Sequence, residues 1–136
     1  MKKIISLIIA ASISMMADSI NWQKDFHTGI KEAKKANKPI LFINSTHTCK
    51  FCIKLDKEIY QDKRVIEELN KNFISIISYN DEKDYLPKEL YLIGTPSIWF
   101  LKSDKKPIFQ SIMGYIPVEQ FLKALEIVKA EYRKGN

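Results

Sequence analysis

Cysteine is scarce in this chain: only two occur among 136 residues, and both lie in the stretch Thr46-His47-Thr48-Cys49-Lys50-Phe51-Cys52. Together with His47 they offer three soft metal ligands, whereas a structural zinc site usually has four. A disulfide between Cys49 and Cys52 would close a very short loop, so it would stabilise the fold less than a long-range bridge. Redox chemistry therefore explains the pair better than metal binding or a structural crosslink, which are the two alternatives.

Long apolar runs are also missing after the first residues. Lys2 and Lys3 precede an apolar stretch from Ile4 to Ala17, which is too short to span a bilayer comfortably and is followed by a small-x-small cleavage site. This pattern predicts a secretory signal peptide over residues 1–19 and a single domain over residues 20–136. An uncleaved N-terminal anchor is the alternative, and the absence of cysteine near the cleavage site argues against a lipoprotein.

The expected helices also lack long runs of charge of one sign. The formal net charge is +6, but lysines alternate with aspartates and glutamates, which is typical of a solvated surface and not of a nucleic-acid-binding stripe. The apolar content of 46% is enough to form one compact core. Export implies an oxidising compartment, and the short Lys-Lys signal is typical of bacteria, so we expect the periplasm.

The cysteine motif lies between an expected strand and an expected helix. The apolar run Ile40 to Ile43 predicts a short buried strand, and residues 49–60 predict a helix that begins at Cys49. Because unpaired N–H groups and the positive end of the dipole lie at a helix N-terminus, the thiolate of Cys49 should be stabilised and its pKa lowered. Cys52 follows one turn later on the apolar face, so it should be shielded and close enough to form a disulfide.

The rest of the mature chain alternates between helical and strand patterns. Apolar residues at helical or strand spacing, separated by proline, glycine and charged turns, predict the boundaries of each element. The expected order is helix 21–37, strand 40–43, helix 49–60, helix 62–71, strand 73–79, a short helix near 87–94, strand 97–101, strand 107–112 and helix 117–132. The first two strands should be parallel and the last two an antiparallel hairpin.

This order, with Cys-x-x-Cys after the first strand and Gly94-Thr95-Pro96 before the third, resembles the thioredoxin fold. The resemblance covers nearly all of the mature chain. It implies an α/β protein whose central mixed four-stranded sheet is flanked by helices on both faces. It also implies a cis Thr95–Pro96 bond beside the cysteines, with the Thr95 backbone and Lys50 and Phe51 contacting an extended substrate segment.

Within this family, the chain is most similar to exported thioredoxin-like proteins and to the periplasmic C-terminal domain of the disulfide-reductase conduit DsbD. Three positions depart from the thioredoxin pattern. Thr48 stands where tryptophan usually precedes the first cysteine, Ile43 stands where a buried acid helps to manage the proton of the second, and Lys50-Phe51 replaces Gly-Pro. The chain therefore need not be a general thioredoxin.

The resemblance implies a periplasmic thiol–disulfide oxidoreductase in which Cys49 attacks and Cys52 resolves, without an organic cofactor or metal. Its partners would be protein thiols and disulfides, with a membrane electron donor of the DsbD type if it acts as a reductase, and we expect a monomer that binds no nucleic acid. His47 should modulate the pair, because a protonated imidazole near Cys49 would stabilise the thiolate. The alternatives are a copper or zinc carrier using His47, Cys49 and Cys52, and a non-catalytic module that clamps peptides at Thr95.

Overall fold

The computed structural model describes residues 17–135. The predicted signal peptide lies almost wholly outside this range and stays a prediction. The elements are α1 (Phe26–Ala36), β1 (Ile40–Ser45), α2 (Lys50–Glu58), α3 (Lys63–Asn72), β2 (Ile74–Tyr79), the 3₁₀ turns η1 (Asn80–Glu82) and η2 (Lys88–Leu90), β3 (Ser97–Leu101), β4 (Ile112–Met113) and α4 (Val118–Lys134). No helix within residues 17–135 is long and apolar enough to cross a membrane.

The four strands form one mixed sheet in the order β2-β1-β3-β4. β1 runs parallel to β2, since α2 and α3 carry the chain back across the sheet between them, and antiparallel to β3. β3 and β4 pair antiparallel. The predicted α/β class and mixed four-stranded sheet are confirmed, and β1 lies at the centre of the sheet, directly before the cysteine motif.

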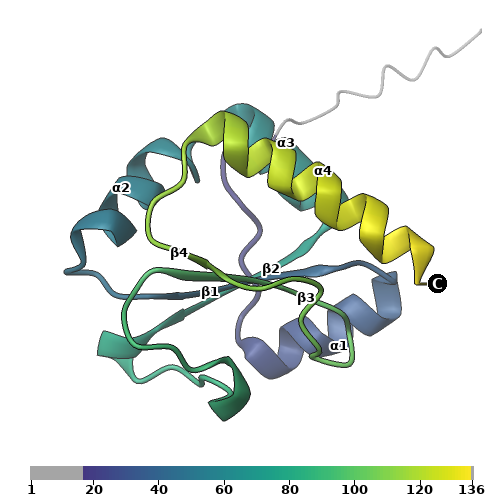
Figure 1. Ribbon diagram of the computed structural model, residues 1–136, viewed down its shortest axis with the longest axis horizontal. Helices are drawn as coiled ribbons and strands as arrows, with labels where there is room; N and C mark the ends of the chain where they lie inside the picture. Colours follow the sequence, from purple (N-terminus) through teal and green to yellow (C-terminus); the bar gives the residue numbers. More distant parts are fainter. Residues whose placement is uncertain (1–16, 136) are drawn as a thin grey trace, which may run out of the picture.

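Two apolar cores lie on opposite faces of the sheet, because successive side chains of a strand point to opposite sides. Leu41 and Ile43 of β1 pack with α2, α3 and α4 on one face. Ile40 and Phe42 pack with α1 on the other face, where Phe26 meets Phe42 edge to face with ring centroids 5.2 Å apart. Figure 1 shows α1 on one side of the sheet and α3 and α4 on the other, so the predicted helices on both faces are confirmed.

The first helix begins later than the sequence predicts. Residues 21–25 were expected to be helical, but Trp22 forms an isolated parallel bridge with Ser75 at the free edge of β2, and the N–H of Gln23 donates to the Ser75 carbonyl at 2.9 Å. Asp25 then caps α1 by accepting from the N–H of Thr28 at 2.7 Å. Pairing with a strand distant in sequence outweighs the local helical pattern here.

The strand predicted over residues 107–112 is wrong in extent. Pro107 forms only an isolated bridge with Leu101, and regular pairing resumes at Ile112 and Met113. The N–H of Ile108 still donates to the Phe100 carbonyl at 2.8 Å, but the chain then bends away from β3 before it returns. The short helix expected near residues 87–94 is a single 3₁₀ turn, η2.

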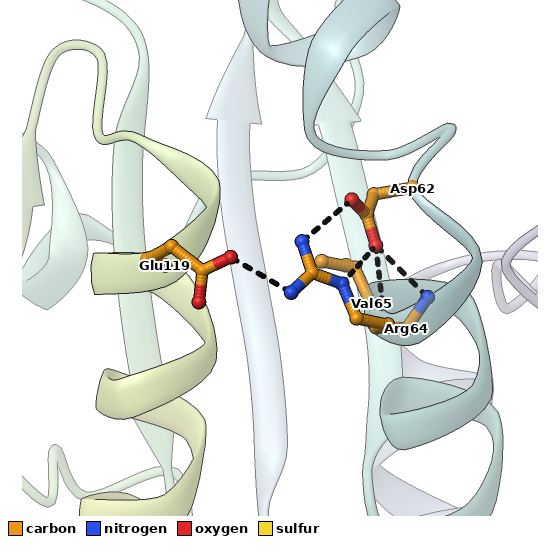
Figure 2. A network of polar contacts seen from close by, with 4 residues as sticks. All are labelled: Asp62, Arg64, Val65 and Glu119. Atoms are coloured by element: carbon orange, nitrogen blue, oxygen red, sulfur yellow. Dashed lines mark hydrogen bonds and ion pairs between the residues drawn. The ribbon is translucent and has the colours of Figure 1, made fainter.

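A polar network joins α3 to α4 on the face opposite α1. Asp62 is the N-cap of α3 and accepts from the N–H groups of Arg64 and Val65 at 2.9 and 3.4 Å. The Arg64 guanidinium contacts the Asp62 carboxylate at 3.2 Å and Glu119 of α4 at 2.7 Å, as Figure 2 shows. Hydrogen bonds from the Arg64 side chain, and then from the backbone of Arg64 and Val65, hold the pKa of Asp62 below its ordinary value although burial acts in the opposite direction.

We predict that Asp62→Ala lowers the free energy of unfolding by about 1 kcal/mol, since an N-cap is lost, whereas Asp62→Asn costs less because asparagine also caps helices. The pKa of the Asp62 carboxyl is lower in the folded state, so its charge stabilises the fold above the ordinary carboxyl pKa, and this stabilisation is lost as the pH falls through the folded pKa. Urea unfolding of wild type and of both variants from pH 7 to 3 measures the free energy of unfolding and its dependence on pH. A gap between wild type and Asp62→Asn that persists at the lowest pH would contradict it.

Candidate active site

The sulfur of Cys49 takes the place of a capping oxygen at the start of α2. Cys49 has extended backbone angles as the N-cap, and its Sγ accepts from the N–H of Cys52 at 3.2 Å. The N–H of Cys49 donates to Thr46 Oγ1 at 3.1 Å, which holds the loop that joins β1 to α2. The thiol of Cys49 also donates to the carbonyl of Thr95 at 3.3 Å. Both cysteines are free thiols here.

The hydrogen bonds that the sulfur accepts favour the thiolate of Cys49. Partial burial by itself would raise its pKa, but hydrogen bonds with Cys52 and Thr95 and with the backbone of Cys52 and Phe51 outweigh this effect, so the pKa of Cys49 lies below the ordinary thiol value. Cys52 is 3% exposed and packs on the inner face of α2, whereas Cys49 is partly open to solvent. The structure thus distinguishes an accessible thiol of lowered pKa from a buried neighbour.

The residues predicted to bind substrate lie around Cys49. The Thr95–Pro96 bond is cis, as the sequence predicts, and it places the Thr95 carbonyl against the Cys49 sulfur. Lys50 is exposed and Phe51 is 47% exposed at the first turn of α2. The structure therefore brings Thr95 and Pro96 next to the cysteines and leaves Lys50 and Phe51 facing outward, while their contact with a substrate stays a prediction.

His47 lies against carboxylates from another loop. Its Nδ1 is 2.9 Å from Asp81 Oδ2, and its backbone N–H donates to the same oxygen at 3.1 Å. Its Nε2 is 3.6 Å from Glu82 Oε1, and its ring stacks on Tyr79 with centroids 4.0 Å apart. The contacts that lower the pKa of Cys49 come from Cys52, Thr95 and Phe51, so the expected effect of His47 on Cys49 stays a prediction.

Asp81 and Tyr79 were not among the site residues predicted from the sequence. The signal that could have found them is the pairing of the two parallel strands, since Ser45 at the end of β1 is in register with Tyr79 at the end of β2. Side chains that follow these two strands must meet at the same edge of the sheet. Within residues 17–135, no group of three or more histidine, cysteine, aspartate or glutamate side chains is arranged to hold a metal ion.

Comparisons with known proteins agree with this geometry. The family model that describes the thioredoxin-like domain matches residues 26–129 of this chain. Anterior gradient protein 3 of Mus musculus is 23% identical over 84% of this chain and 76% of its own. The thiol:disulfide interchange protein DsbD of Campylobacter jejuni is 26% identical over 85% of this chain, which spans only 20% of that longer protein.

Solved structures show the same fold. The DsbH oxidoreductase superimposes with a TM-score of 0.67 at 16% identity, covering 90% of this chain and 92% of its own. The oxidised C-terminal domain of DsbD from Neisseria meningitidis gives a TM-score of 0.61 at 19% identity, covering 74% of this chain and 90% of its own. With its Cys49-x-x-Cys52 motif at the start of α2, the chain therefore belongs to the thioredoxin-like family of thiol–disulfide oxidoreductases.

Proposed function

We propose that this protein reduces or exchanges disulfides of exported proteins in the periplasm, with Cys49 as the attacking thiol and Cys52 as the resolving thiol. One observation carries the proposal. The Cys49 sulfur lies at the N-terminus of α2, where it accepts from the N–H of Cys52 and contacts the carbonyl of Thr95, and its pKa is lowered. A thiolate that is accessible near neutral pH is the species that attacks disulfides.

The chemistry proceeds through a mixed disulfide. The Cys49 thiolate attacks one sulfur of the substrate disulfide, and the other substrate sulfur leaves with the electron pair. Cys52 then attacks the Cys49 sulfur, so that the substrate is released as a second thiol and the Cys49–Cys52 disulfide forms. The reverse sequence oxidises a dithiol. Both steps use only the two thiols of this chain, and the buried position of Cys52 keeps it from reacting first with bulky substrates.

The leader-like sequence and the relatives support the proposed compartment and electron donor. The apolar segment behind Lys2 and Lys3 supports export. The similarity to DsbD supports a membrane partner of that type, which would return electrons to the pair. A peptide clamp at Thr95 would bind the same extended segments without turnover, so catalytic reduction of insulin by the full domain separates the two functions. Binding of insulin without its reduction would overturn the proposal.

The lowered pKa of Cys49 leads to a pH prediction. In the folded protein, alkylation of Cys49 by iodoacetamide should have its midpoint below the ordinary thiol pKa of about 8.5 and return towards that value in guanidinium chloride. Cys52 should stay unmodified until the protein unfolds. Mass spectrometry of alkylated peptides across pH 5 to 10 measures both cysteines, with Cys49→Ser as the control for Cys52. Equal labelling of the two thiols in the folded state would remove the basis for their different roles.

Trapping should reveal the order of attack. Cys52→Ser should accumulate mixed disulfides with substrate proteins, because nothing resolves the bond to Cys49. Cys49→Ser should accumulate none, since the remaining thiol is buried. Non-reducing electrophoresis after exposure to a disulfide-containing protein distinguishes the variants, and the opposite pattern would reverse the assignment.

The exposed aromatic ring of Phe51 should contribute to substrate binding. We predict that Phe51→Ala lowers kcat/KM for a protein disulfide by about tenfold, equivalent to about 1.4 kcal/mol, because a half-exposed ring is buried in the complex. Reduction of a small aromatic-free disulfide should change little. Ile127→Ala is the matched control, since Ile127 is 49% exposed on α4 whereas Phe51 is 47% exposed. If Phe51→Ala lowered kcat/KM equally for the protein disulfide and for the small disulfide, a role of Phe51 in binding protein substrates would be excluded.

A further inference from the structure

A small cavity lies beside the buried thiol of Cys52. Its volume is about 80 Å³, and its walls include His47 from the loop after β1, Tyr79 of β2, and Asp56 and Tyr60 from α2 and the turn after it. The Tyr60 hydroxyl is buried and has no hydrogen-bond partner within residues 17–135. A buried hydroxyl needs a partner, and a cavity of this size can hold water. The cavity therefore brings Cys52 and several titratable side chains around one small space that can hold water.

His47 is held at this cavity by contacts on three sides. Asp81 Oδ2 faces both the Nδ1 and the backbone N–H of His47, Tyr79 stacks on the ring, and Glu82 lies 3.6 Å from Nε2. In the neutral tautomer whose Nδ1 donates to Asp81, the lone pair of Nε2 can accept a proton. Once Nε2 is protonated, Asp81 and Glu82 stabilise the imidazolium. The position of the ring is thus defined by its neighbours.

The other titratable groups around the cavity are poorer proton acceptors for a thiol. Burial raises the pKa of Tyr60 well above the ordinary value, and the charges of Cys52, Tyr79 and Asp56 add to this effect. Burial also raises the pKa of Tyr79, so both phenols stay protonated. A carboxyl group ordinarily has a pKa of about 3.9, far below the thiol value of about 8.5, whereas an imidazole at about 6.5 is much closer. Proton transfer is most efficient when the acceptor titrates near the working pH.

We propose that His47, positioned by Asp81, accepts the proton of Cys52 through this cavity during the resolving step. The inference rests on the proposed function, because it assigns a role within that reaction. Ile43 of β1 is fully buried and its side chain cannot accept a proton. The cavity provides a route for the proton, from the inner face of α2 to the edge where β1 and β2 end.

The step balances as follows. The Cys52 S–H proton passes to His47 Nε2, and the Cys52 thiolate attacks Cys49 Sγ of the mixed disulfide. The Cys49–Cys52 bond forms as the bond between Cys49 and the substrate sulfur breaks, and the substrate leaves as a thiolate with the electron pair. The substrate sulfur is reduced and the Cys49–Cys52 pair is oxidised. The imidazolium then returns its proton to the departing thiolate or to solvent.

The test measures the two steps separately. Reduced full-length protein is mixed with a peptide disulfide, quenched in acid at successive times, and analysed by mass spectrometry for mixed disulfide at Cys49 and for the Cys49–Cys52 disulfide. The variants are His47→Ala, Asp81→Asn and Asp56→Asn. The matched control is His27→Ala, because His27 is the other histidine of the chain and is exposed on α1.

For His47→Ala, the resolving rate at pH 7 should fall by about tenfold or more, and by a larger factor than the rate of mixed-disulfide formation, which reports separately on the predicted effect of His47 on the Cys49 thiolate. The loss should shrink as the pH rises towards the thiol pKa, where Cys52 ionises without an acceptor, and added imidazole should restore part of the rate. Asp81→Asn should give a smaller loss, since the amide oxygen still accepts from Nδ1 but carries no charge. Asp56→Asn and His27→Ala should resolve at the wild-type rate.

Several outcomes would overturn the inference while leaving the proposed function intact. One is normal resolution in His47→Ala, and another is a loss that imidazole does not restore and that is equal at every pH, which indicates a structural role. A loss in Asp56→Asn with normal His47→Ala would assign the acceptor to Asp56. If wild-type protein forms no mixed disulfide at all, the proposed function fails and the inference fails with it.

Discussion

The hydrogen bonds at the N-terminus of α2 are the contacts on which the site depends. A sulfur atom replaces the usual capping oxygen, so the same interaction that begins the helix also stabilises the Cys49 thiolate. Thr46 also holds the backbone of Cys49, and the loop before β3 places the Thr95 carbonyl against the sulfur. Fold stability and thiol reactivity are thus coupled through one residue.

The sheet supplies the rigid support for this arrangement. β1 is the central strand, packed on both faces by apolar residues and paired on both edges, and it ends immediately before the cysteine loop. Its parallel pairing with β2 brings the loops after the two strands to one edge of the sheet, where His47 meets Asp81. The polar contacts beside the site therefore depend on the apolar packing beneath it.

Much of the fold was predictable because its signals are local. Short, mostly apolar runs identified the strands 40–43, 73–79 and 97–101, and the helical spacing of apolar residues in the last segment identified α4. The start of α1 and the extent of β4 were not predictable from local patterns. Trp22 pairs with Ser75, far away in sequence, and the chain bends away from β3 after Ile108 although its residues suit a strand.

The amino-acid sequence by itself determined the thiol pair, its place at a helix start, the different exposure of Cys49 and Cys52 and the Thr-Pro segment, because short spacings and capping residues act within a few positions. Only the tertiary structure decided what surrounds the pair. His47 and Asp81 are 34 residues apart, and the cavity beside Cys52 is built from α2, β2 and two loops. Such contacts depend on the register between β1 and β2, which is set by simultaneous packing on both faces of the sheet and not by any single segment.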